Sequence, residues 1–170
     1  MIDYEEKLSP HFTVGEMLRS GMAIQRNIKN VPSAHPEDGL TDEEMIRNLR
    51  ALCVNVLEPL RRRVGRVIVT SGYRCKQLNR VVGGVPNSLH TRGMAVDIHV
   101  SNMEMCRRYE RVLRSLGKCT ELVLEPRGMP RKRWIHVGMG KWEKGDVKWE
   151  RGNVRCEMGN GRGEMGEGKR

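Results

Sequence analysis

The order of the predicted elements favours an α+β fold, in which N-terminal and central helices pack against a small, mainly antiparallel sheet. Apolar residues recur at helical spacing through 45–60 and 105–116. Short apolar or alternating runs at 66–70, 94–100, 120–125 and 134–139 are typical of strands. Because helices and strands do not alternate regularly, a parallel βαβ sheet is not expected.

The helix boundaries follow from local signals. Capping-box patterns, in which Ser or Thr precedes Glu by three residues, predict helix starts at Thr13, Thr41 and Ser101. Within the second helix Pro59 predicts a kink, and Gly65 predicts the end. Glycines and prolines around 83–86 indicate a loop before the strand at 94–100.

The chain divides into a folded domain over 1–139 and a tail over 140–170. From Lys141 a seven-residue repeat carries a basic residue first, Glu third and Gly fifth. A coiled coil requires two apolar heptad positions and disfavours a glycine in every repeat. We therefore expect the Gly/Lys/Glu-rich tail to be flexible, as segments that cannot bury a core usually are.

Composition excludes some classes of protein. Lys and Arg total 31 against 21 Asp and Glu, a net charge of +10, which favours an anionic partner. No stretch approaches eighteen apolar residues, so a transmembrane helix and membrane insertion are not expected. The acidic start of the chain lacks the apolar run of a signal peptide, which predicts a cytoplasmic protein at synthesis. Five cysteines without a C-x-x-C pair argue against a zinc knuckle and predict reduced thiols, with Cys53 and Cys106 in helix interiors.

Alternation places three polar side chains on one face of the sheet. In the strand 94–100, Met94, Val96, Ile98 and Val100 share the face expected to point to the core, which leaves Asp97 on the other. In the last strand His136 points away from the core between Ile135 and Val137. Upstream, Gly93 allows a sharp turn that brings His90 toward Asp97. Two imidazoles and a carboxylate with an open fourth position are what a catalytic zinc requires.

Other histidines are weaker candidates. His99 shares the face of Asp97 and is the main rival ligand, whereas His11 and His35 lie in loop-like stretches. The chain contains no H-E-x-x-H, so a helix-borne zinc peptidase site is excluded.

The motifs around these residues resemble the zinc D-Ala-D-Ala carboxypeptidase family, which includes D,D-carboxypeptidases, D,D-dipeptidases and phage endolysins that cut peptidoglycan. The resemblance covers about 9–139 and is carried by Ser71-Gly-Tyr-Arg74, Asn79, Gly83-Gly84, Ser88-x-His90-x-x-Gly93-x-Ala95-x-Asp97-Ile98 and Trp134-Ile-His136-Val. The opening His11-Phe12-Thr13-x-x-Glu16 is similar to the variant found in phage and bacterial proteins.

The resemblance implies a role for each matching position. His90, Asp97 and His136 would be the zinc ligands, on the small sheet. Arg74 would hold a substrate carboxylate or the oxyanion, with Tyr73 and Ser88 in supporting, substrate-binding positions.

Family members place a glutamate general base shortly before the last histidine. Glu125 is the candidate here, with Glu121 as the second choice, although Glu125 precedes His136 by eleven residues, a wider gap than the family pattern. The spacer holds four cations, which either line the approach of an anionic stem peptide or solvate a loop: Arg127, Arg131, Lys132 and Arg133. A cysteine peptidase built on Cys75 and His90 is disfavoured, because no group to orient the base is evident.

The leading hypothesis is a monomeric zinc peptidase that hydrolyses an amide bond in peptidoglycan stem peptides, as a D,D-carboxypeptidase or an endolysin-type endopeptidase. Release to the cell wall, by phage lysis or from a virion, would bring it to that substrate. The main alternative is a non-catalytic wall-binding module that retains the fold. A nucleic-acid-binding protein ranks third, since only 4% of residues are aromatic and no binding motif is present.

Overall fold

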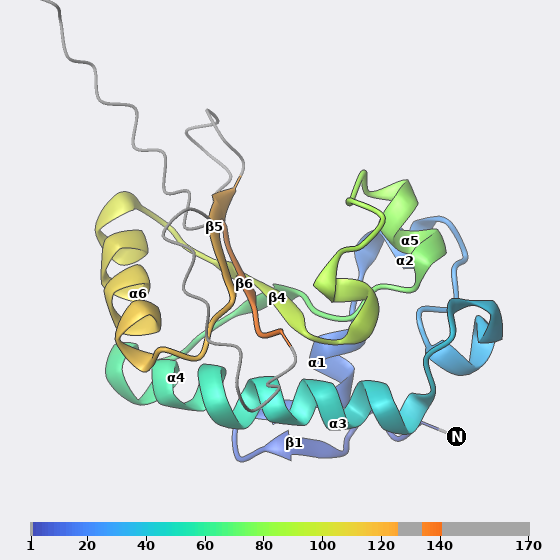
Figure 1. The fold of residues 1–170 in the computed structure, drawn as a ribbon, viewed down its shortest axis with the longest axis horizontal. Coiled ribbons are helices and arrows are strands. Elements are labelled where there is room, and N and C mark those ends of the chain that lie inside the picture. Colours follow the sequence, from blue (N-terminus) through green and yellow to red (C-terminus); the bar gives the residue numbers. More distant parts are fainter. Residues whose placement is uncertain (1, 126–133, 141–170) are drawn as a thin grey trace, which may run out of the picture.

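The structure, a computed structural model, describes residues 2–125 and 134–140 (Figure 1). Beyond Gly140 the predicted tail lies outside the described residues, and so do the four cations of the 126–133 spacer. None of the helices in the described ranges combines the length and the apolar character needed to span a membrane.

The helices and strands follow the α+β order that the sequence predicts. The strands are β1 (Lys7–Ser9), β2 (Phe12–Thr13), β3 (Val69–Ser71), β4 (Ala95–His99), β5 (Glu121–Glu125) and β6 (Trp134–Gly138). The α-helices are α1 (Val14–Leu18), α2 (Gly21–Gln25), α3 (Asp42–Leu52), α4 (Glu58–Val64), α5 (Lys76–Val81) and α6 (Met103–Leu116). Short 3₁₀ turns are η1 (Pro32–Ala34), η2 (Pro36–Asp38) and η4 (Leu89–Arg92), and η3 (Cys53–Leu57) is a π-helical turn.

The main sheet has the order β3-β4-β6-β5, and every neighbouring pair is antiparallel. In Figure 1 it stands above the long helical run of α3, η3 and α4, with α6 to its left and α5 to its right. A separate hairpin joins β1 to β2. The predicted small antiparallel sheet packed against helices is therefore confirmed.

One helical run from α3 through α4 forms the base of the core. It begins at the predicted capping box, in which Thr41 Oγ1 accepts from the Glu44 N–H. Proline lacks an N–H and its ring clashes with the carbonyl four residues earlier, so the wider π-helical turn η3 accommodates Pro59 where the sequence predicts a kink. The run ends at Gly65, which has a positive φ of 88°, as predicted.

The N-terminal helix α1 supports the segment that carries Arg74. The Tyr73 N–H donates to Met17 O over 2.9 Å. A Cβ on Gly72 would lie 2.4 Å from the same carbonyl oxygen, so only glycine permits this close approach of the two backbones.

Two predicted boundaries are wrong. Helix α6 begins one residue later than predicted, because the cap is Asn102, whose Oδ1 accepts from the Met105 N–H, rather than Ser101. The buried strand predicted at 66–70 is instead the edge strand β3 at 69–71, and Ile68 is 49% exposed. An apolar run cannot distinguish an edge strand from a central one, because it reports composition and not position in the sheet.

The core lies between the sheet and these helices. Val96, Ile98, Ile135 and Val137 of the two central strands are buried, as their alternation predicts. Cys53 and Cys106 are buried in helical segments, as expected.

Candidate metal centre

Three side chains predicted as ligands meet at one point. His90 Nε2 lies 3.2 Å from both Asp97 Oδ1 and His136 Nδ1, and the latter two atoms lie 3.1 Å apart. Tetrahedral zinc, with bonds of about 2.0–2.2 Å to N and O, holds its ligand atoms roughly 3.3 Å apart. The triangle therefore has nearly the dimensions of one face of such a site. Within residues 2–125 and 134–140 it is the one group of three such side chains that could hold a metal.

The strand register positions two of these side chains. Asp97 of β4 is the direct partner of His136 of β6, and side chains of directly opposed residues lie on the same face of a sheet. His99 is the partner of Trp134 instead, and its Nε2 lies 3.2 Å from Ser101 Oγ. The rival ligand is therefore not part of the cluster.

A tight turn positions the third side chain. His90 lies in η4, whose first turn is capped by Ser88 Oγ, an acceptor for the His90 N–H at 3.3 Å. The turn ends at Gly93, whose φ of 67° is the left-handed conformation that glycine adopts without strain. The chain then enters β4, so that His90 and Asp97 converge as the sequence predicts.

Hydrogen bonds fix the direction of the His90 ring. Its Nδ1 lies 2.6 Å from Gly72 O, and a carbonyl oxygen can only accept. The hydrogen therefore resides on Nδ1, and the Nε2 lone pair faces the cluster. Such a bond to the second ring nitrogen is typical of metal-ligating histidines.

Arg74 contacts the cluster directly. Its Nη2 donates to Asp97 Oδ2 and lies 3.1 Å from His90 Nε2, while its Nε donates to Ser71 Oγ over 2.9 Å. The guanidinium thus engages the carboxylate oxygen that does not face both imidazoles. Burial lowers the pKa of Arg74, and the charge of Asp97 opposes that shift.

The cluster is electrostatically coupled. Burial by itself would raise the pKa of Asp97, but its close contacts with His136 and His90 and the charge of Arg74 hold that pKa well below its usual range. Burial would lower the pKa of His136, yet its hydrogen bonds to Asp97 and Glu121 raise that pKa to about 9. A divalent cation bound at the cluster would supply the positive charge that the Asp97 carboxylate otherwise draws from the neighbouring histidines.

The other predicted site residues differ in their placement. Tyr73 is 1% exposed, and its hydroxyl has no hydrogen-bond partner among the described residues, so it packs in the core and not at an accessible surface. Ser88 is buried and serves as a helix cap. Glu125 pairs through its backbone with Trp134, but its side chain lies outside what the structure describes. A role in substrate binding or catalysis for these three residues stays a prediction.

Cys75 does not fit a nucleophile. Its side chain is buried, its Sγ accepts from the Leu78 N–H at the start of α5, and burial raises the pKa of the thiol. Reactive cysteines require the opposite, an accessible thiol with a lowered pKa.

Sequence reasoning missed Asn30, which connects the N-terminal helices to the segment that carries Arg74. Its Nδ2 donates to Leu18 O and Tyr73 O, and its Oδ1 accepts from the Cys75 N–H, all within 3.1 Å. No local pattern could reveal it, since two of these partners lie more than 40 residues away.

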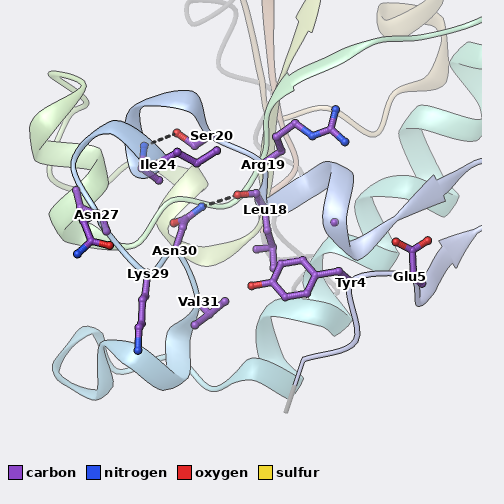
Figure 2. A pocket seen from close by; sticks show the side chains of 13 residues that line it. Tyr4, Glu5, Leu18, Arg19, Ser20, Ile24, Asn27, Lys29, Asn30 and Val31 are labelled. Carbon is purple, nitrogen blue, oxygen red and sulfur yellow. Dashed lines mark hydrogen bonds between the residues drawn. The ribbon is translucent and has the colours of Figure 1, made fainter.

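Asn30 also lines a hollow of about 780 Å³ beside α1 and α2 (Figure 2). In Figure 2 the Asn30 side chain reaches Leu18, while Arg19 and Lys29 lie farther out on the lining. None of the cluster residues lines this hollow. The hollow and the cluster of His90, Asp97 and His136 are therefore separate features of the described structure.

Comparison with known proteins identifies the family. A family model described as Peptidase M15 matches residues 10–138. A search of curated proteins found no significant match. The matched segment contains all three side chains of the cluster and the Ser71–Arg74 segment beside it. The chain therefore belongs to the peptidase M15 family, the zinc D-Ala-D-Ala carboxypeptidase family.

Proposed function

We propose that this protein is a zinc metallopeptidase that hydrolyses an amide bond in peptidoglycan stem peptides, as a D,D-carboxypeptidase or an endolysin-type endopeptidase. The observation that carries the proposal is the triangle of His90 Nε2, Asp97 Oδ1 and His136 Nδ1, with sides of 3.1–3.2 Å. Membership of the M15 family supports a metallopeptidase and a peptidoglycan substrate.

His90, Asp97 and His136 would hold the zinc ion. The donor set fits, because two imidazole nitrogens and one carboxylate oxygen are borderline ligands that suit zinc and leave one position open. Zinc bound there would lower the pKa of a water molecule toward neutrality and polarise the scissile carbonyl.

The protein supplies the proton transfers and the charge stabilisation. Glu125 would accept a proton from the attacking water and later donate it to the leaving amine. Arg74, held between Ser71 and Asp97, would stabilise the negative charge on the carbonyl oxygen or bind the terminal carboxylate of the substrate. The backbone pairing of Glu125 with Trp134, two residues before His136, supports this assignment.

Two measurements on the full chain test the proposal. Metal analysis is expected to find about one zinc ion per chain, lost in His90→Ala. Digestion of purified peptidoglycan, with the products identified by mass, is expected to release a fragment with a new amino or carboxyl end and to show which bond is cut. A protein that binds peptidoglycan but releases no fragment would instead be a wall-binding module. Wild-type protein without bound zinc would overturn the proposed mechanism.

A further inference from the structure

Glu121 reaches the cluster diagonally across two strands. Its backbone pairs with Gly138 of β6, not with His136. Nevertheless Glu121 Oε2 lies 2.7 Å from His136 Nε2. Diagonal neighbours on an antiparallel pair lie within reach of long side chains, and Glu121 uses that reach.

Gly138 provides the space for this contact. A Cβ at Gly138 would lie 2.9 Å from Glu121 Oε2, so the carboxylate would have to move away, and it would lie 3.0 Å from Glu121 Cβ, which is a tight contact. The same Cβ would lie 2.8 Å from Leu89 Cδ1 in the turn that carries His90. The absence of a side chain at this position thus lets the Glu121 carboxylate lie across β6 against the imidazole.

The contact determines which nitrogen of His136 faces the cluster. A carboxylate only accepts hydrogen bonds, so a neutral His136 ring donates from Nε2 to Glu121 and keeps its lone pair on Nδ1. That Nδ1 is the atom 3.1 Å from Asp97 Oδ1 and 3.2 Å from His90 Nε2. Because the two nitrogens lie on different edges of the ring, Glu121 approaches from the side away from the cluster. This placement suits an orienting partner and not a general base.

We propose that Glu121 is a positioning residue that holds His136 with Nδ1 toward the metal, and that Gly138 makes this arrangement possible. The proposal rests on the proposed zinc site. Carboxylates that receive the second N–H of a ligating histidine fix its tautomer and raise its basicity, and their loss weakens metal binding about 10–100-fold.

The test compares zinc dissociation constants, measured by competition with a chelator, for four variants of the full chain. Glu121→Ala is expected to weaken zinc binding about 10–100-fold, and Glu121→Gln less, because its amide oxygen still accepts from Nε2. Gly138→Ala is expected to weaken zinc binding although Glu121 is retained. Glu104→Ala, which removes an exposed carboxylate on α6, is the matched control and is expected to bind zinc as the wild type does.

Imidazole ¹⁵N NMR supplies a readout that a merely structural role would not move. In the zinc-loaded wild type, His136 is expected to carry its hydrogen on Nε2, with Nδ1 bound to the metal. In Glu121→Ala the Nε2–H chemical shift is expected to move away from the value of a hydrogen-bonded group, or the Nε2 proton is expected to exchange faster with solvent.

The outcomes separate this proposal from the proposed function. Wild-type protein that binds no zinc would overturn both. Wild type that binds zinc, with equal affinity and an unchanged His136 signal in Glu121→Ala, would overturn only the positioning role. A Glu121→Ala protein that binds zinc normally but no longer cleaves peptidoglycan would also overturn it, and would make Glu121 the base in place of Glu125.

Discussion

Asp97 and His136 are direct partners across β4 and β6, and their Oδ1 and Nδ1 atoms lie 3.1 Å apart. This pairing depends on register, because a slip of one residue would turn one of the two side chains to the opposite face of the sheet. Five consecutive residue pairs, from Ala95 with Gly138 to His99 with Trp134, hold the two strands in place. The candidate metal centre is therefore built on a regular pair of strands and not on loops alone.

Replacement of Asp97 by Asn is expected to abolish zinc binding at micromolar metal. The amide has nearly the shape of the carboxylate but lacks the charge that faces His90, His136 and Arg74. Since loss of an outer partner alone weakens metal binding about 10–100-fold, loss of a ligand should exceed about 100-fold. Chelator competition measures this, with Glu43→Gln on the exposed start of α3 as the control. Wild-type affinity in Asp97→Asn would contradict the ligand assignment.

Gly72→Ala is expected to lower both stability and zinc affinity. The new Cβ would lie 2.4 Å from Met17 O and 2.9 Å from Met17 Cα, which are backbone atoms that cannot rotate away. Relief of this overlap must shift Gly72 O, the acceptor for His90 Nδ1. Overpacking of this kind costs about 1–3 kcal/mol in the free energy of unfolding, which urea denaturation measures.

The control for Gly72→Ala is Gly21→Ala. No atom lies within 4 Å of the Cβ position at Gly21, the first residue of α2. Alanine there should leave zinc affinity unchanged and stability equal or slightly higher, because alanine is the better helix former. Equal behaviour of the two variants would show that the contact between Gly72 and Met17 is unimportant.

The sequence could predict which side chains share a face and that three of them converge, but not the lateral register that brings further residues to them. Alternation placed Asp97 and His136 away from the core, and the structure confirms their convergence with His90. Periodicity carries no information about lateral register, so the contacts from Gly72 to His90 and from Glu121 to His136 were not predictable.

Residue type was also an incomplete guide to role. Tyr73 matches a family motif and was predicted as a supporting, substrate-binding residue; the structure shows its side chain buried, and its N–H bonded to Met17 O of α1, so that role stays a prediction. A short motif identifies a segment, while the tertiary fold decides which of its side chains are accessible.

Arg74→Lys distinguishes the two roles proposed for this guanidinium. Lysine keeps the charge but loses the planar fork that engages Ser71 and Asp97. If Arg74 stabilises the oxyanion, kcat should fall about 10²–10³-fold with little change in KM. If it binds a substrate carboxylate equally in ground and transition states, KM should rise at constant kcat. Steady-state kinetics on a defined stem peptide give both values, and no change in either would remove Arg74 from both roles.

Glu125→Gln tests the proposed base. Loss of a general base typically lowers kcat about 10²–10⁴-fold, and because Glu125 is not a proposed ligand, zinc affinity should remain at the wild-type level. The rate of fragment release from peptidoglycan and chelator competition measure the two effects separately. A fully active Glu125→Gln protein would show that another group accepts the proton.

Glu58→Gln is expected to destabilise the protein in a pH-dependent way. The contacts of Glu58 involve no residue of the metal cluster. The Glu58 carboxylate, near the start of α4, accepts from Ser9 Oγ at 2.8 Å and from the His11 N–H at 2.9 Å, and its Oε2 lies 2.9 Å from His11 Nδ1. These contacts anchor the hairpin of β1 and β2 to the long helical run. Burial would raise the pKa of Glu58, but the hydrogen bonds from His11 and Ser9 lower it below its ordinary value of 4.5.

The sign of the pH effect follows from that shift. A carboxyl group with a lowered pKa in the folded state stabilises that state fully above its ordinary pKa, and this contribution is lost as the pH falls through the lowered value. At pH 7 the variant should therefore lose about 1.5–3 kcal/mol of unfolding free energy, the range for hydrogen bonds to charged groups. Below pH 4.5 its deficit relative to wild type should shrink. Urea denaturation across this pH range measures the deficit, with Glu43→Gln as the exposed control. A deficit that stayed constant with pH would show that Glu58 acts through packing and not through its charge.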